Sequence, residues 1–240
     1  MGNDYFQFKR FTVRQSRAAM KVCTDACVFG AYVAQNISAA RVLDIGAGTG
    51  LLSLMYAQKH PDAHIDAIEI EPNAYLQAKE NLEQSPWAEN IQVHHCALQQ
   101  YENTTVQYQY GLILSNPPFF DKDLRSGDAA RNTAMHSTQL SLSEIFQFSS
   151  NHLVADGRLA LLLPFHRHED AQNIALQNGF FLEDALLVRQ SPRHGFFRSI
   201  LFFSKQGQPV RTSEMAIRNI ENQYDAAFAA LLRDYYLFLE

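Results

Sequence analysis

Short apolar runs alternate with helical segments along most of the chain, and this alternation restricts the possible folds more than any other feature. The runs predict strands at 41–45, 63–70, 90–95, 110–115 and 158–164. Helices are expected between them, at 51–59, from Pro72, and after a capping box formed by Ser141 and Glu144. Strands separated by helices favour an α/β protein with a doubly wound, mostly parallel sheet.

The last third of the chain departs from this alternation. Asp156-Gly157 predicts a turn before the strand at 158–164, and Asn178-Gly179 predicts the end of a further helix. Two apolar runs at 180–190 and 195–205 then predict an antiparallel hairpin at the edge of the sheet. Residues 224–240 predict a C-terminal helix.

The length of 240 residues predicts a single domain. We divide it into an N-terminal segment (1–40) that covers substrate and cofactor, a catalytic core (41–205), and a C-terminal strand and helix extension (206–240). No apolar run approaches the length of a membrane span, and three cysteines, an odd number, argue against a disulfide scaffold. We therefore expect a cytoplasmic protein with no membrane association, no metal and no obligate protein partner.

A glycine-rich loop follows the first predicted strand and opens the first predicted helix. Its glycines, Gly46, Gly48 and Gly50, allow a tight turn and a close approach of the backbone to a ligand. Glycine-rich turns without a ligand also occur, but ligands of such sheets bind beyond the carboxyl ends of the strands, where this loop lies. Glu69 ends the next predicted strand and can accept hydrogen bonds from both hydroxyls of a ribose.

The acid just before the loop indicates which cofactor binds there. Asp44 lies where a dinucleotide would need donors for its pyrophosphate, and its negative charge would repel that group. S-adenosylmethionine has no phosphate, and a carboxylate favours both its ammonium and its sulfonium group. The loop and its acid resemble those of class I methyltransferases, which implies a Rossmann-like fold and S-adenosylmethionine as cofactor.

The strand at 110–115 is followed by Asn116-Pro117-Pro118-Phe119, at the same edge of the sheet. The motif can simply end a strand, but it also suits transfer of a methyl group to a poorly nucleophilic exocyclic nitrogen. The Asn116 side-chain carbonyl and the Pro117 backbone carbonyl would accept its two hydrogens, orient its lone pair and stabilise the developing positive charge. Phe119 would stack on a planar substrate. The motif resembles that of methyltransferases acting on adenine N6, guanine N2 or protein glutamine N5.

The formal net charge of −5 excludes a protein that is basic all over, yet the charges are unevenly distributed. Residues 60–105 carry eight acids against one lysine. Basic residues gather before and after the core, where they are candidates for contacts to an RNA backbone: Lys9, Arg10, Arg14, Arg17 and Lys21, and then Arg189, Arg193 and Arg198. For any single arginine, a solvated surface charge is the alternative interpretation.

A more specific resemblance spans nearly the whole chain. The opening FQFKRFTVRQSRAAMKVCTDACVFGAYV, the central DIGAGTGLLSLMYAQ, IEIEPNA and LSNPPFF, and the final YDAAFAALLRDYYL are similar to those of bacterial valine-tRNA adenine-37 N6-methyltransferases. The resemblance implies methylation of an adenine in a tRNA anticodon loop, with tRNA(Val) as the partner. It also implies that Thr24 and Asp25 lie over the methionine end of the cofactor. Cys23 departs from the family, which more often has glycine there.

Three other functions stay open at this stage. A glutamine N5-methyltransferase of a translation factor would share both central motifs, but we would expect it to carry a separate N-terminal helical domain. The 40 residues before Arg41 leave little room for one. An rRNA guanine-N2 methyltransferase would also share the motifs. Intact Asp44, Glu69 and Asn116 argue against the third alternative, an RNA-binding factor without activity.

Overall fold

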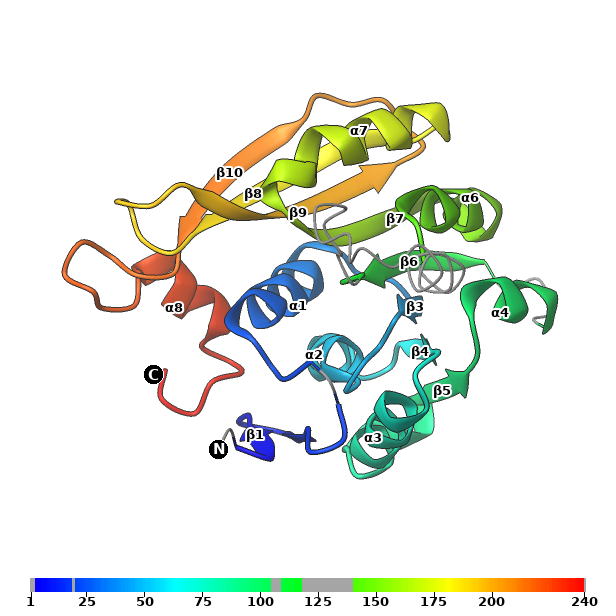
Figure 1. Cartoon of the computed structure of the whole chain (residues 1–240), viewed down its shortest axis with the longest axis horizontal. Coiled ribbons are helices and arrows are strands. Elements are labelled where there is room, and N and C mark those ends of the chain that lie inside the picture. Colours follow the sequence, from blue (N-terminus) through cyan, green and yellow to red (C-terminus); the bar gives the residue numbers. More distant parts are fainter. Residues whose placement is uncertain (1–2, 19, 105–108, 118–139, 240) are drawn as a thin grey trace, which may run out of the picture.

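The computed structural model describes residues 3–18, 20–104, 109–117 and 140–239, and within these ranges eight strands form one sheet (Figure 1). The strand order is β10-β8-β9-β7-β6-β3-β4-β5, and among these strands only β9 runs antiparallel to its neighbours. The sequence prediction of a mostly parallel α/β sheet is confirmed. The bounds are β3 (Arg41–Ile45), β4 (His64–Glu69), β5 (Ile91–His95), β6 (Tyr110–Ser115), β7 (Leu153–Pro164), β8 (Phe181–Arg189), β9 (Phe196–Ser204) and β10 (Arg211–Ala216).

Helices cover both faces of the sheet, so the strands are buried between two hydrophobic cores (Figure 1). One core includes side chains of α1 (Thr24–Asn36), α2 (Leu51–Lys59), α3 (Pro72–Glu83) and α8 (Ala226–Leu232). The other includes side chains of α4 (Leu98–Thr104), α6 (Leu142–His152) and α7 (His168–Gln177). Short 3-10 turns at η1 (Ala88–Asn90) and η2 (Phe165–Arg167) precede β5 and α7.

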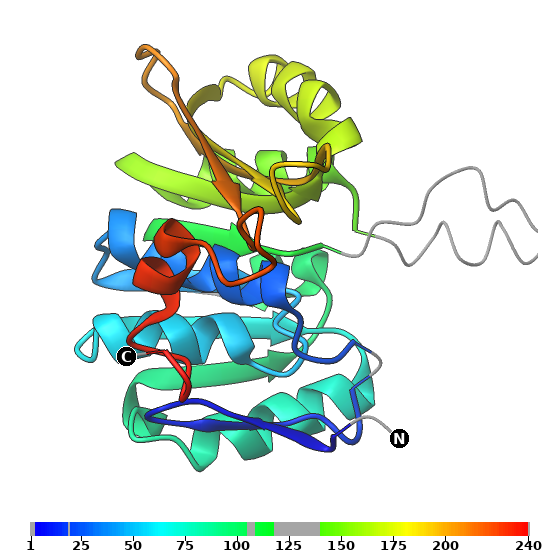
Figure 2. The same ribbon diagram turned by 90° about the vertical axis from the view of Figure 1, so that its left-hand side faces the viewer.

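The two ends of the described chain meet beside the sheet. A small hairpin of β1 (Tyr5–Gln7) and β2 (Thr12–Arg14) lies against the C-terminal segment, as Figure 2 shows. Phe8 pairs with Tyr236 in an antiparallel bridge, and the Phe8 ring lies 4.7 Å from Phe6 and 6.0 Å from Tyr236 between centroids. Aromatic packing therefore joins the hairpin to the end of the chain.

Three details of the secondary structure differ from the sequence predictions. The β8–β9 hairpin is present, but it does not form the edge of the sheet as predicted. The strand β10 pairs in parallel with β8 and forms that edge. Asp156-Gly157 lies inside β7, where the register with β6 shifts. A Cβ on Gly157 would lie 3.0 Å from the Tyr110 carbonyl oxygen, so the glycine allows the close approach of the two strands. The C-terminal helix covers only Ala226–Leu232.

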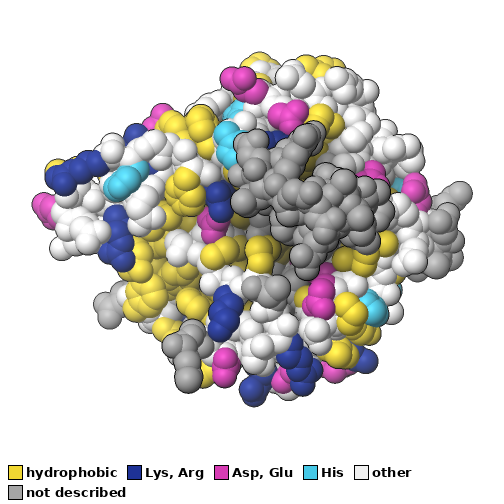
Figure 3. Space-filling view, viewed as in Figure 1, with side chains coloured by type: hydrophobic (Ala, Val, Ile, Leu, Met, Phe, Trp, Pro, Cys, Tyr) yellow, Lys and Arg dark blue, Asp and Glu magenta, His cyan; other side chains and the backbone are white. Residues whose placement is uncertain are grey.

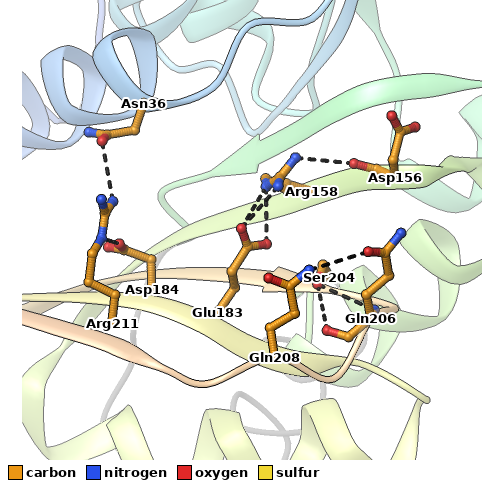
Figure 4. A network of polar contacts seen from close by, with 9 residues as sticks. All are labelled: Asn36, Asp156, Arg158, Glu183, Asp184, Ser204, Gln206, Gln208 and Arg211. Carbon is orange, nitrogen blue, oxygen red and sulfur yellow. Dashed lines mark hydrogen bonds and ion pairs between the residues drawn. The ribbon is translucent and has the colours of Figure 1, made fainter.

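A polar network holds the edge strand β10 against the rest of the sheet (Figure 4). Asp184 of β8 is buried and accepts a hydrogen bond of 2.7 Å from the Tyr32 hydroxyl of α1. It also accepts one from the Arg211 guanidinium of β10, which in turn donates to the Asn36 side chain of α1 at 3.3 Å. The C-terminal extension is thus fixed to the core through a buried carboxylate with two donors.

Candidate active site

The carboxyl ends of three adjacent parallel strands form the predicted site. Ile45 of β3 pairs with Ser115 of β6 and with Ile68 of β4, so these three residues lie level with one another near the strand ends. The next residue in each case, Gly46, Asn116 and Glu69, therefore lies at the same edge of the sheet. At a strand spacing of about 4.8 Å, Asn116 and Glu69 lie on either side of the glycine loop. The structure brings the two central motifs of the sequence together.

The glycine loop turns sharply between β3 and α2. Gly46, Gly48 and Gly50 have φ of +75°, +59° and +78°, a region that other residues enter only with strain. The Gly46 and Ala47 amides both donate to the Ile68 carbonyl, at 2.9 and 3.0 Å, which anchors the loop to β4. A Cβ built on Gly46 or Gly48 would have no atom of the described residues within 4 Å. The loop thus presents open backbone surface to a ligand.

Asp44 lies beneath this loop as a fully buried carboxylate. Its Oδ2 accepts a hydrogen bond of 2.7 Å from the Ser53 hydroxyl of α2, while its Oδ1 has no partner in the described residues. Burial and the nearby charge of Glu69 raise the pKa of Asp44 to about 7, although the hydrogen bonds from Ser53 act in the opposite direction. A buried acceptor without a donor is unfavourable, and a cationic ligand group would supply the donor.

Glu69 is held by two backbone amides. Its Oε2 accepts from the Gly48 N–H and its Oε1 from the Glu71 N–H, both at 2.8 Å. Each carboxylate oxygen retains a second lone pair, so both can still accept a hydroxyl. The two fixed oxygens of Glu69, the buried Oδ1 of Asp44 with no described partner, and the open glycine loop together fit S-adenosylmethionine.

The second motif begins where β6 ends. The Ser115 hydroxyl donates to the Ile45 carbonyl at 2.7 Å and ties β6 to β3. Asn116 is half-buried and Pro117 is buried. Phe119 lies outside the described residues, so its predicted stacking role stays a prediction.

The N-terminal segment is attached beside the glycine loop by two buried polar side chains of α3, which sequence analysis missed. The Asn81 amide donates to the carbonyls of Arg14 and Thr49 at 2.8 Å each, and its carbonyl accepts from the Arg14 N–H at 2.9 Å. Gln77 accepts from the Arg17 N–H at 3.2 Å. The available signal was a pair of polar residues, four apart, on the buried face of an amphipathic helix.

Thr24 and Asp25 begin α1 at the same edge of the sheet. The Asp25 carboxylate accepts a hydrogen bond of 2.7 Å from the Arg198 guanidinium of β9, so a predicted cofactor residue is paired with a predicted RNA residue. Cys23 has an extended backbone with φ of −126° and needs no glycine. Burial and the adjacent Asp25 raise the pKa of the Cys23 thiol to about 12, so the thiol stays protonated.

Most of the predicted RNA-binding residues already have partners within the protein. In the N-terminal group, Arg14 and Arg17 lie 3.4 and 3.8 Å from Glu80, and Arg10 lies over the Trp87 ring. Lys9 and Lys21 donate to backbone carbonyls, Lys9 to Arg233 and Leu239 and Lys21 to Asn3. In the second group, Arg189 pairs with Glu214 at 3.0 Å, whereas Arg193 is exposed in the β8–β9 turn and forms no ion pair with any described residue.

Two features are absent from the part of the chain that the structure describes. Among these residues, no helix has the length and apolar character needed to cross a membrane. In the same ranges, no three His, Cys, Asp or Glu side chains are placed to share a metal ion.

Comparisons with known proteins show the family and the fold of the chain. Residues 28–181 match the methyltransferase small domain family. The structure is similar to a predicted O-methyltransferase from Agrobacterium tumefaciens, with a TM-score of 0.64 at 17% identity over 86% of this chain and 94% of that one. It is also similar to the ribosomal protein L11 methylase of Lactobacillus delbrueckii, with a TM-score of 0.56 at 16% identity over 81% and 84%. These likenesses show a class I methyltransferase fold.

Full-length relatives are more informative than the fold. The chain is 39% identical over its whole length to the whole tRNA1(Val) (adenine(37)-N6)-methyltransferase of Cytophaga hutchinsonii. It is 37% identical, over 99% of each chain, to the protein of the same name from Trichodesmium erythraeum. Taken with the glycine loop, its two acids and the Asn-Pro-Pro motif, these identities show that the chain belongs to the tRNA1(Val) (adenine(37)-N6)-methyltransferase family of S-adenosylmethionine-dependent enzymes.

Proposed function

We propose that this protein methylates the exocyclic N6 of adenine 37 in the anticodon loop of tRNA1(Val). The observation that carries the proposal is the alignment of Gly46, Glu69 and Asn116 at one edge of the sheet. This alignment supports a cofactor site and an amine-binding motif that lie side by side on three neighbouring strands. The substrate named for the full-length relatives supplies the identity of the amine.

Each residue of the cofactor site would contact, or leave room for, a particular group of the cofactor. Asp44 would hold the ammonium group of S-adenosylmethionine with its free Oδ1, and Glu69 would hold the two ribose hydroxyls. When bound, S-adenosylmethionine supplies an electrophilic methyl group. Gly46 and Gly48 leave room for it, because among the described residues no side chain fills the space above their backbone.

Asn116 and Pro117 would act on the amine. The lone pair of an adenine N6 is delocalised into the ring, so the amine is a poor nucleophile. Two carbonyl acceptors on its hydrogens orient the lone pair and stabilise the positive charge that develops on the nitrogen. The proline ring fixes φ and restricts the residue before it, which keeps the carbonyls stiffly in place. Because the proton can leave to water after transfer, no general base is needed.

An anticodon-loop base suits such a site. It is unpaired, so turning it out of the loop costs less than extracting a base from a duplex. We expect the terminal segments, 1–40 and 206–240, to contribute to the choice of tRNA, since the central motifs are shared with other amino-group methyltransferases. A tRNA substrate also agrees with the cytoplasmic location that the sequence predicts.

Nucleoside analysis tests the proposal. The purified protein is incubated with labelled S-adenosylmethionine and total tRNA from a strain that lacks the enzyme, and the nucleosides are identified by mass spectrometry. We expect N6-methyladenosine in tRNA1(Val). N2-methylguanosine, or label in protein in place of RNA, would contradict the proposal.

A further inference from the structure

Next to the catalytic motif, the strands β7, β9 and β8 extend further than β6 does. We call this extension of the sheet the wall. β6 ends at Ser115, which pairs with Leu161 of β7, but β7 continues to Pro164. Pro164 pairs with Arg198 of β9, and Arg198 pairs with Val188 of β8. At about 3.3 Å per residue, the three strands extend roughly 10 Å past the level of Ser115. Side chains on these extended strand ends therefore lie beside any substrate held at Asn116.

A bulge directs two adjacent aromatic rings to different places on this wall. Arg189 of β8 pairs with Phe196, whereas the preceding Val188 pairs with Arg198, so Phe197 is the extra residue. Phe197 packs against the core that includes α1. The Phe196 ring instead lies 5.4 Å from the Phe165 ring of η2. Without the bulge, strict alternation would place Phe196 on the α1 side, together with Arg198.

Phe165, Phe196 and Arg189 form what we call the rim platform. The Arg189 guanidinium lies over the Phe196 ring, 5.3 Å from its centroid, and is held by Glu214 at 3.0 Å. Phe165 is 38% exposed, so part of its ring is accessible, and the His168 ring lies edge-on to it at 6.2 Å between centroids. Arg193, exposed in the adjoining turn, adds a positive charge that no described acid neutralises. Figure 3 shows this face of the molecule, on which hydrophobic side chains lie among Lys, Arg and His and among Asp and Glu.

We propose that the rim platform binds an unpaired nucleotide next to the target adenine by stacking, with Arg193 near its phosphate. This inference rests on the proposed function. A planar base fits an exposed aromatic ring beside a guanidinium plane, because both stack on its face. An exposed cation next to this pair complements an RNA backbone. Placing the contact on a neighbouring base also helps to position the target and to select the loop.

The chain supplies a matched control at the opposite edge of the same sheet. Phe181 begins β8, at the end far from Asn116, and is 41% exposed, close to the value for Phe165. Truncation of either ring removes a similar exposed surface, so the two variants should fold equally well. Only Phe165 stands on the wall beside the catalytic motif.

Binding measurements with the full-length protein test the inference. The affinity for an unmodified tRNA1(Val) transcript is measured by fluorescence anisotropy, and that for S-adenosylmethionine by calorimetry. Phe165→Ala should raise the Kd for tRNA roughly 5- to 150-fold, the range for loss of one base-stacking contact. Its Kd for S-adenosylmethionine should not change. Phe165→Trp and Phe181→Ala should both bind tRNA as the wild type does.

An abasic substitution completes the test. A transcript lacking the base on one side of the target adenine should bind the wild type more weakly, and Phe165→Ala should add no further loss. If Phe165→Ala binds tRNA like the wild type, or Phe181→Ala weakens binding equally, the rim platform is not a stacking site. In that case methylation of tRNA by the wild type would leave the proposed function intact. If the wild type methylates no tRNA, the proposed function fails first and this inference with it.

Discussion

At the scale of single residues, the buried carboxylate of Asp44 explains why the cofactor site would bind a cation. Asp44 is fully buried, accepts one hydrogen bond from Ser53 and leaves Oδ1 without a partner in the described residues. Its raised pKa, about 7 against an ordinary 3.8, shows how unfavourable the ionised form is there. The negative charge of Asp44 could be predicted from the sequence. That its Oδ1 lacks a hydrogen bond could not be predicted, because this depends on which groups surround the side chain.

The Asp44 pKa predicts pH-dependent cofactor binding. A cationic ligand favours the ionised carboxylate, so below pH 7 binding must release a proton, and affinity should rise with pH up to about 7. Calorimetry in two buffers of different ionisation enthalpy measures this proton release. Asp44→Asn should bind more weakly and lose this pH dependence. The ionisation of the ligand itself is common to both proteins and cancels in the comparison.

The raised pKa of Asp44 should also make the cofactor-free protein less stable as the pH rises, whereas it makes cofactor binding tighter. Because the folded pKa is raised, the contribution of Asp44 to stability is fully present below about pH 3.8 and is lost as the pH rises through about 7. The free energy of unfolding of the wild type should therefore fall relative to that of Asp44→Asn between pH 4 and 7. Equal pH profiles for the two proteins would contradict the assignment.

At the scale of elements, local signals predicted helix ends well and edge strands poorly. The Ser141–Glu144 capping box, Pro72 at the start of α3 and positive φ at Gly179 after α7 all confirm predictions from the sequence. A strand was expected in the C-terminal extension 206–240. Its bounds and its pairing with β8 could not be predicted, because only Met215 of the six residues of β10 is buried and the strand has almost no apolar alternation. The C-terminal helix stops early because Tyr235 and Tyr236 pack toward α2 and the N-terminal hairpin.

The attachment of the N-terminal segment to α3 gives a stability prediction. Asn81→Leu removes three hydrogen bonds and leaves the Arg14 amide and two carbonyls without this partner. We expect a loss of about 2–4 kcal/mol in the free energy of unfolding in urea, since each unsatisfied buried group costs about 1–3 kcal/mol and leucine recovers some burial. Asn73→Ala, exposed on the same helix, is the control and should change stability by less than about 0.5 kcal/mol. An equal effect of both variants would show that Asn81 does not hold the segment.

At the scale of the whole molecule, the fold pairs one basic stretch of the sequence with the acidic one. Arg14 and Arg17 lie against Glu80, which belongs to the acidic stretch 60–105. The other basic stretch, 185–200, lies at the far side of the sheet, and its Arg193 is unpaired among the described residues. Both stretches were candidates in the sequence. Only the three-dimensional arrangement distinguishes an arginine with an acidic partner, such as Arg14, from Arg193, which has none among the described residues.

This arrangement predicts an unequal salt dependence of tRNA binding. Arg193→Ala should reduce the slope of log K against log salt by about 0.7–0.9, the value for one phosphate contact. Arg14→Ala should change the slope less, because Glu80 already compensates its charge. Binding isotherms over a range of salt concentrations measure both slopes. A larger change for Arg14→Ala would reverse the assignment of the RNA-binding side.

The most direct test of the central claim is the single-turnover rate of methyl transfer to tRNA1(Val) by Asn116→Ala, measured with tRNA and S-adenosylmethionine at saturating concentrations. If Asn116 orients the adenine N6 and stabilises its developing charge, the rate should fall by on the order of 10²-fold or more. The Kd values for tRNA and S-adenosylmethionine, measured separately, should change much less. An unchanged rate would contradict the claim that the Asn-Pro-Pro motif carries the chemistry.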